Sequence, residues 1–170
     1  MIMPTTVKNE DMIVIGMGEI AVKKQSMSVL SCLGLGSCIA LCAYDPVSKV
    51  GGMVHIVLPQ GGNKEGENCL AKYADTAVPL LLQEMAKNGG IRSRLVVKLV
   101  GGAQLSLALG LDGAFKTGER NTAMVIAALT KEGIPVAAMD VGGNRGRTVR
   151  MFLDTGKVTV RTAGNETKEL

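Results

Sequence analysis

Two apolar runs separated by a short turn constrain the fold of this chain more than any other feature. Cys38 to Tyr44 (CIALCAY) and Val50 to Leu58 (VGGMVHIVL) each have the length and composition of a strand, and Asp45-Pro46-Val47-Ser48 between them has the composition of a turn. The spacing predicts an antiparallel hairpin. The second run is apolar on both faces, as a central strand is, so both faces of its sheet must be covered.

Further short runs predict additional strands around this hairpin. Apolar residues at helical spacing predict one helix between Leu70 and Met85, and a second runs from Asn121, as its N-cap, to Lys131. The pattern predicts an α/β or α+β protein, with mixed β-sheets in a layered sandwich covered by two main helices. The other predicted strands are residues 12–15, 20–23, 27–32, 95–100, 136–141, 147–153 and 158–161.

Length and composition limit the broad class. A chain of 170 residues with 46% hydrophobic residues fits one domain, residues 1–170, in which 1–10 read as a loose arm and 163–170 as a polar tail. No apolar run approaches the ~20 residues of a membrane span, so we expect the protein to stay in the cytoplasm. A net charge of +4 with two Tyr, two Phe and no Trp argues against nucleic-acid binding.

The four cysteines are Cys32, Cys38, Cys42 and Cys69, and in a reducing compartment we expect free thiols. The glycine-rich segment Gly34-Leu35-Gly36-Ser37-Cys38 allows a sharp turn that leaves backbone N–H groups free to face a developing oxyanion. A thiol at the end of such a turn can attack a carbonyl. On spacing alone, an inert buried cysteine remains the alternative.

The chain contains one histidine, which narrows the choice of base. A cysteine nucleophile generally needs an imidazole to form thiolate near neutral pH, so any Cys–His pair must use His55. Pairing of the two strands about their turn brings His55 opposite a residue near position 39. Cys38 and His55 are therefore predicted neighbours.

Three other patterns invite alternative interpretations. A zinc site from Cys32, Cys38, Cys42 and His55 lacks the usual C-x2-C spacing. Residues 16–21 (GMGEIA) satisfy a relaxed dinucleotide fingerprint, but no helical pattern follows, which favours a glycine turn between strands. The arginines of residues 142–147 (GGNRGR) fit either a site for an acidic partner or a solvated loop.

The segment LGLGSCIALCAYDPVSKVGGMVHIVLP, which contains Cys38 and His55, resembles the signature of the CheD family. The likeness continues in KYADTAVPLLLQEM, which resembles the family's first helix, in GERN, at the start of its second, and in DVGGNRGRTVRMFLDTG, in its C-terminal strands. The resemblance extends from about Ile13 to Val160.

The resemblance implies a protein-glutamine deamidase. Members hydrolyse glutamine side-chain amides on chemoreceptor helices to glutamate and ammonia, and some bind the phosphatase CheC. Their fold is a layered α/β structure resembling certain toxin deamidases, and no cofactor or metal is expected. Carried over to this chain, Cys38 is the nucleophile and His55 the general base, while the turn at Gly36 and Ser37 helps to form the oxyanion site.

One position departs from the family pattern. The third catalytic residue of the family is a threonine six places before the cysteine, and this chain has Cys32 there. A thiol is a poor hydrogen-bond partner for orienting an imidazole. The alternative function is therefore a weakly active or inactive CheD-like binding protein that regulates CheC or receptors.

Overall fold

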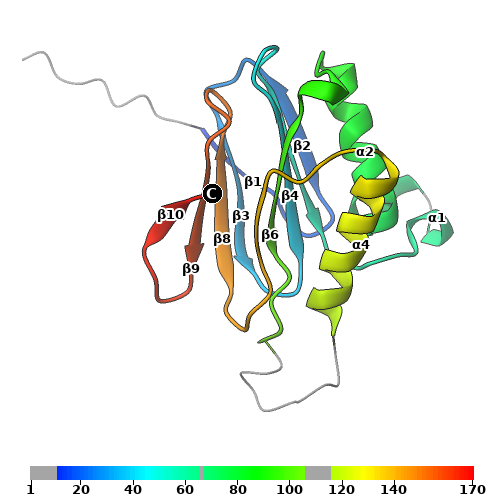
Figure 1. The fold of residues 1–170 in the computed structure, drawn as a ribbon, viewed down its shortest axis with the longest axis vertical. Helices are drawn as coiled ribbons and strands as arrows, with labels where there is room; N and C mark the ends of the chain where they lie inside the picture. Colours follow the sequence, from blue (N-terminus) through cyan, green and yellow to red (C-terminus); the bar gives the residue numbers. More distant parts are fainter. Residues whose placement is uncertain (1–10, 66, 106–115) are drawn as a thin grey trace, which may run out of the picture.

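The computed structural model describes residues 11–65, 67–105 and 116–170, and within them the chain forms two five-stranded sheets. Figure 1 shows the sheets stacked side by side, with the helices on one outer face. The outer sheet has the order β1 (Met12–Val14), β3 (Val29–Leu35), β8 (Arg147–Phe152), β9 (Val158–Thr162), β10 (Thr167–Glu169). The central sheet has the order β2 (Ile20–Lys24), β5 (Val50–Ile56), β4 (Ile39–Asp45), β6 (Val96–Gly101), β7 (Ala138–Val141).

Two long helices, α2 (Ala74–Lys87) and α4 (Thr117–Lys131), cover the free face of the central sheet. The short helices are α1 (Gly62–Glu65), η1 (Glu67–Lys72) and η2 (Arg92–Arg94). Within the described ranges, none of these helices has the length and hydropathy needed to cross a bilayer. Each sheet contains one parallel pair, β1·β3 or β6·β7, among antiparallel ones. The predicted fold class, mixed sheets in layers covered by two main helices, is confirmed.

The central sheet separates two apolar cores. Alternation along β4 sends Ile39, Leu41 and Ala43 toward the helices, and Ala40, Cys42 and Tyr44 toward the outer sheet. All seven residues of β4 and all seven of β5 are buried. This explains why the hairpin sequence is apolar on both faces.

The predicted hairpin is confirmed, with a defined register. β4 and β5 pair antiparallel from Asp45 opposite Val50 to Ile39 opposite Ile56, which places Ala40 directly opposite His55. The turn is stabilised at its start because the Asp45 carboxylate accepts hydrogen bonds from the N–H groups of the two residues that follow Pro46. The ends of these strands opposite the turn therefore bring Cys38 and His55 into one region.

Several boundaries differ from the sequence-based predictions. The apolar run at residues 12–15 predicts a buried strand, but β1 is an edge strand with exposed Met12 and Val14. The segment expected to end at the glycines after Cys32 instead continues to Leu35, because a bulge absorbs the irregularity. Helix α4 begins at Thr117, one turn earlier than predicted, so Asn121 is not its N-cap.

The chain ends also bear on the predictions. The polar tail expected at residues 163–170 contains β10, which pairs with β9, and Lys98 Nζ donates to the backbone carbonyl oxygen of Leu170 at 2.7 Å. Polar composition did not reveal this strand because an edge strand needs no apolar face of its own. The loose arm predicted at residues 1–10 lies outside the described residues.

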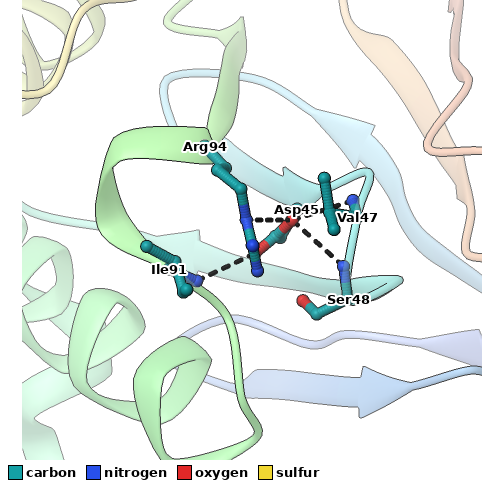
Figure 2. Close-up of polar contacts among 5 residues, drawn as sticks. All are labelled: Asp45, Val47, Ser48, Ile91 and Arg94. Atoms are coloured by element: carbon teal, nitrogen blue, oxygen red, sulfur yellow. Dashed lines mark hydrogen bonds and ion pairs between the residues drawn. The ribbon is translucent and has the colours of Figure 1, made fainter.

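A buried ion pair ties the hairpin turn to the segment that follows α2 (Figure 2). The Asp45 side chain is fully buried, and the Arg94 guanidinium donates to it through Nε and through Nη2, the latter at 2.8 Å. The N–H groups of Ile91, Val47 and Ser48 also donate to this carboxylate. Burial alone raises the pKa of Asp45, but these donors outweigh it and hold the pKa well below its ordinary value.

We expect Asp45→Asn to lower the free energy of unfolding by about 3 kcal/mol, because it leaves the Arg94 charge and several N–H groups without an anionic acceptor. Since the folded-state pKa is depressed, the ionised carboxylate contributes stability above its unfolded pKa of about 4, and that contribution is lost as the pH falls. The difference between wild type and variant in urea unfolding should therefore shrink below pH 4.

The matched control is Asp154→Asn, in the turn after β8, whose carboxylate accepts no hydrogen bond from the described residues. This control should change stability by less than about 0.5 kcal/mol. The role given to Asp45 would be contradicted if both variants lost the same free energy of unfolding. It would also be contradicted if the difference between wild type and Asp45→Asn stayed the same below pH 4.

Candidate active site

The predicted nucleophile lies in the turn between the two sheets. β3 of the outer sheet ends at Leu35, β4 of the central sheet begins at Ile39, and Gly36 to Cys38 connect them. The bulge before this turn places Gly34 in a left-handed conformation with φ of 59°. Gly36, Ser37 and Cys38 are half-buried, so the turn reaches the surface at one end of both sheets.

All three carbonyl oxygens of this turn accept hydrogen bonds from segments far along the chain. The Ala103 N–H donates to the carbonyl oxygen of Gly36 at 2.8 Å, and the Gly102 N–H donates to that of Cys38 at 2.9 Å. The side-chain amide of Asn121 donates to the carbonyl oxygen of Ser37 at 2.9 Å. The turn is therefore fixed from the strand β6 end and from helix α4 at once.

This anchoring also fixes the N–H groups of the turn. A trans peptide unit is planar, so holding one carbonyl oxygen sends the following N–H in the opposite direction. The N–H groups of Ser37 and Cys38 thus point away from β6 and α4, and within the described part of the chain no oxygen accepts a hydrogen bond from either. Two adjacent, oriented donors beside a thiol are suited to hold an oxyanion.

Glycines at the end of β6 make this close approach possible. Gly101 has φ of 122°, and a side-chain carbon at this position would collide with the Cys38 carbonyl oxygen. Arg147 holds the backbone of this strand end, because it donates to the carbonyl oxygens of Gly101 and Gly142. Its Nε also lies 3.0 Å from the Asp140 carboxylate. Arg147 is buried in this role, so this arginine of the predicted solvated or partner-binding loop is structural.

His55 is buried and held in one orientation by the backbone. Its Nδ1 lies 3.0 Å from the carbonyl oxygen of Ile15. A carbonyl can only accept, so Nδ1 carries the hydrogen and Nε2 of the neutral ring carries the lone pair. The imidazole is thereby set up to take a proton through Nε2.

The glycine-rich turn between β1 and β2 holds the same histidine. The Gly18 N–H donates to the carbonyl oxygen of His55 at 2.9 Å, and the His55 N–H donates to that of Glu19 at 3.0 Å. The Glu19 carboxylate closes the turn by accepting from the Gly16 N–H at 2.7 Å. No helix follows, since β2 starts at Ile20, so the preferred interpretation as a turn between strands is confirmed over a dinucleotide loop.

The strand register relates the two predicted catalytic residues. His55 is opposite Ala40, and Cys38 is two residues before Ala40, on the same face of the central sheet. Both side chains lie on the face toward the outer sheet, since Cys38 packs against that core and His55 contacts Ile15 of it. Diagonal neighbours of this kind on adjacent strands lie within reach of longer side chains.

The thiols differ in exposure and acidity. Burial raises the pKa of the half-buried Cys38 thiol above its ordinary value, and a hydrogen bond from its own N–H partly offsets the rise. Burial raises the pKa of Cys42 to about 12, against a lowering by the Lys98 charge, and raises the pKa of Cys32 still further, helped by the other two thiols. Near neutral pH the Cys38 sulfur is therefore mostly protonated and needs a base to react.

Cys32 lies on β3 in the core between the sheets. It is fully buried, with its sulfur 3.5 Å from that of Met53, the residue two places before His55. Among the described residues, the imidazole makes its hydrogen bond with the Ile15 carbonyl oxygen and not with Cys32. Within residues 11–65, 67–105 and 116–170, the three cysteines and His55 of the alternative zinc site do not come together as a group that could hold a metal ion.

Sequence reasoning missed the residues that support the turn. The sequence predicts Asn121 as a helix cap, and it assigns no role to Gly101-Gly102-Ala103 at the end of β6. The Ile15 carbonyl belongs to the backbone, so no side-chain pattern announces it. A buried polar residue inside an amphipathic helix, as Asn121 is in α4, was the one available signal.

The chain is similar to a known protein family over most of its length. A model of the family described as "CheD chemotactic sensory transduction" matches residues 57–162. A protein of Desulfitobacterium hafniense named "Probable chemoreceptor glutamine deamidase CheD" is 44% identical over 158 residues, covering 93% of this chain and 98% of that protein. Any span of that length includes both Cys38 and His55.

Two further relatives agree. A Thermotoga maritima protein named "Chemoreceptor glutamine deamidase CheD" is 45% identical over 151 residues, covering 89% of this chain and 92% of that protein. An Archaeoglobus fulgidus protein named "Probable chemoreceptor glutamine deamidase CheD" is 40% identical over 149 residues, covering 88% and 92%. The similarity thus extends over nearly the whole chain.

Thiol alkylation tests the contrast among the cysteines. In the native protein, iodoacetamide should modify Cys38 well before the buried Cys32 and Cys42, as read by peptide mass spectrometry. Because the Cys38 pKa is raised, its rate should keep increasing about tenfold per pH unit from pH 6 to 8. A rate already constant over that range, or modification of Cys32 as fast as Cys38, would contradict this description.

Proposed function

The chain belongs to the CheD family, and from this premise we propose that it deamidates glutamine side chains of chemoreceptors, with Cys38 as nucleophile and His55 as general base. The products are a glutamate side chain and ammonia. The observation that carries the proposal is that Cys38, just before β4, and His55, on the adjacent strand β5, lie on one face of the central sheet. They lie beside a turn whose Ser37 and Cys38 N–H groups donate to no oxygen of the described residues. The names of its relatives give the substrate class.

The first half of the reaction forms a thioester. His55 Nε2 takes the thiol proton as the Cys38 sulfur attacks the side-chain carbonyl carbon of glutamine, and the carbonyl oxygen becomes an oxyanion. The N–H groups of Ser37 and Cys38 stabilise that charge. The protonated imidazole then gives its proton to the departing nitrogen, the carbon–nitrogen bond breaks, and ammonia leaves.

The second half releases the product. Neutral His55 takes a proton from water, the resulting hydroxide adds to the thioester carbon, and the same N–H groups hold the new oxyanion. The carbon–sulfur bond breaks and the thiol regains its proton from the imidazole. The Ile15 hydrogen bond supports both halves because it keeps Nε2 as the atom that accepts and returns protons.

Setting and partners follow from the same proposal. We place the reaction in the cytoplasm, where four free cysteines remain reduced. The main partner is a chemoreceptor helix that presents glutamines. The phosphatase CheC is a second proposed partner, and Cys32 in place of the family's threonine is the residue that favours a regulatory role over rapid turnover.

Mass spectrometry of receptor fragments tests the nucleophile. Fragments incubated with the wild-type protein should show glutamine converted to glutamate, and Cys38→Ala should lower the rate by about 10⁴-fold or more, because the covalent step is lost. Cys69→Ala, at a half-buried cysteine in η1, is the matched control and should retain the wild-type rate.

The same assay separates the rival functions. Conversion that survives Cys38→Ala would remove Cys38 from the mechanism. Binding of the fragments by wild type without conversion would favour the regulatory protein, and cleavage of the receptor backbone would identify a peptidase instead.

Substitution of the histidine tests the base. His55→Gln should lower kcat for deamidation by about 10²- to 10⁴-fold with little change in KM, because proton transfer and not substrate contact is removed. The loss should be smaller at pH 9 than at pH 7, since more thiolate is present without a base. A variant equally impaired at both pH values would argue for a purely structural His55.

A further inference from the structure

Asn121 lies in the second turn of α4, with its side chain fully buried against the end of the central sheet. Its Nδ2 donates two hydrogen bonds, to the carbonyl oxygens of Ser37 and Val57, both at 2.9 Å. Carbonyl oxygens accept only, so the nitrogen of the amide must be the atom that faces them. Both hydrogens of this NH2 group are thus used on the two chain segments that carry the predicted catalytic residues.

The two acceptors lie where the pairing of β4 with β5 ends. The β4·β5 ladder has its last pair at Ile39 and Ile56, so Cys38 and Val57 occupy the next, unpaired step. Asn121 spans this step from the helix side. Where the backbone pairing of the two strands has ended, the Asn121 side chain connects the segment before Cys38 to the segment after His55.

One of the two bonds acts directly on a proposed oxyanion donor. The Ser37 carbonyl and the Cys38 N–H belong to the same planar peptide unit. Fixing the carbonyl oxygen with Asn121 therefore fixes the direction of the Cys38 N–H. The other two anchored carbonyls, of Gly36 and Cys38, set the neighbouring peptide units and not this one.

The amide oxygen of Asn121 gives independent support. Oδ1 is buried and has no hydrogen-bond partner among the described residues. An unsatisfied buried oxygen is unfavourable, and an apolar side chain of similar size fills the same space without that penalty. A role limited to packing does not account for asparagine here, whereas its two donors do.

We propose that Asn121 is a positioning residue that aims the Cys38 N–H at the oxyanion and holds the Cys38 and His55 segments in register. It touches neither the substrate nor the reacting atoms. The proposal rests on the proposed deamidase function and extends it to α4, a helix that otherwise covers the sheet.

Two substitutions test it in the full chain. Asn121→Asp is isosteric but places a carboxylate against two carbonyl oxygens, and Asn121→Ala removes the donors without adding charge. Each should lower kcat for deamidation of receptor fragments by about 10- to 100-fold while KM changes less than about threefold. The matched controls are Asn88→Asp and Asn88→Ala at the end of α2, because Asn88 Nδ2 also donates to a carbonyl, that of Glu84 at 2.9 Å, away from the turn. These should retain the wild-type kcat.

The readouts separate positioning from folding. Activity is measured well below each variant's Tm and is expressed per folded molecule, so a residue that only stabilises the fold would lower Tm and leave kcat unchanged. Wild-type protein provides a second measurement that needs no variant. By NMR, both side-chain amide protons of Asn121 should exchange slowly with solvent, and rapid exchange would overturn the proposal.

The outcomes also separate this inference from the function on which it rests. If wild type converts glutamine and both Asn121 variants match it in kcat, the positioning role is wrong and the deamidase function stands. If wild type converts nothing, the function itself fails. A large rise in KM with kcat intact would move Asn121 to substrate binding and likewise overturn the proposal.

Discussion

Burial of β4 on both faces is the constraint on which the rest of the structure depends. A strand enclosed by the outer sheet on one side and by α2 and α4 on the other has no freedom to shift its register. Its polar ends must then be satisfied locally. Asp45 at one end does this with Arg94 and backbone donors, and the Gly36–Cys38 turn at the other does it with carbonyl contacts. A rigid strand thus holds the Cys38 thiol, the proposed nucleophile, in a fixed place.

The site is built mainly from the main chain. The proposed oxyanion donors are backbone N–H groups, the partner of His55 Nδ1 is a backbone carbonyl, and glycines 101 and 102 bring β6 against the Cys38 turn. Side chains serve chiefly to hold these backbone groups, as Arg147 and Asn121 do. Such a site loses little conformational entropy when substrate binds, because its donors are already oriented.

The sequence predicted the parts of this structure that depend on local pattern. The hairpin followed from two apolar runs and a turn. Because the chain has one histidine, His55 could be proposed as the base without any knowledge of its surroundings, and that role stays a prediction. The strand at Thr167–Glu169 and the start of α4 at Thr117 were missed because pairing with a distant strand, or packing on a sheet, decides them. The supports of the turn were missed for the same reason. Asn121 is 84 residues from Ser37, and only the folded chain brings them together.

The hydrogen bond from His55 to the Ile15 carbonyl has a consequence for how this chain tolerates substitution. Every amino acid at position 15 supplies the same oxygen, so no ordinary point mutation deletes the group that sets the histidine's tautomer. The imidazole of this chain is therefore anchored although position 32 carries a thiol, which is a poor hydrogen-bond partner. What this anchor does depend on is the chain path between β1 and β2, where Gly18, with φ of 75°, permits the bend.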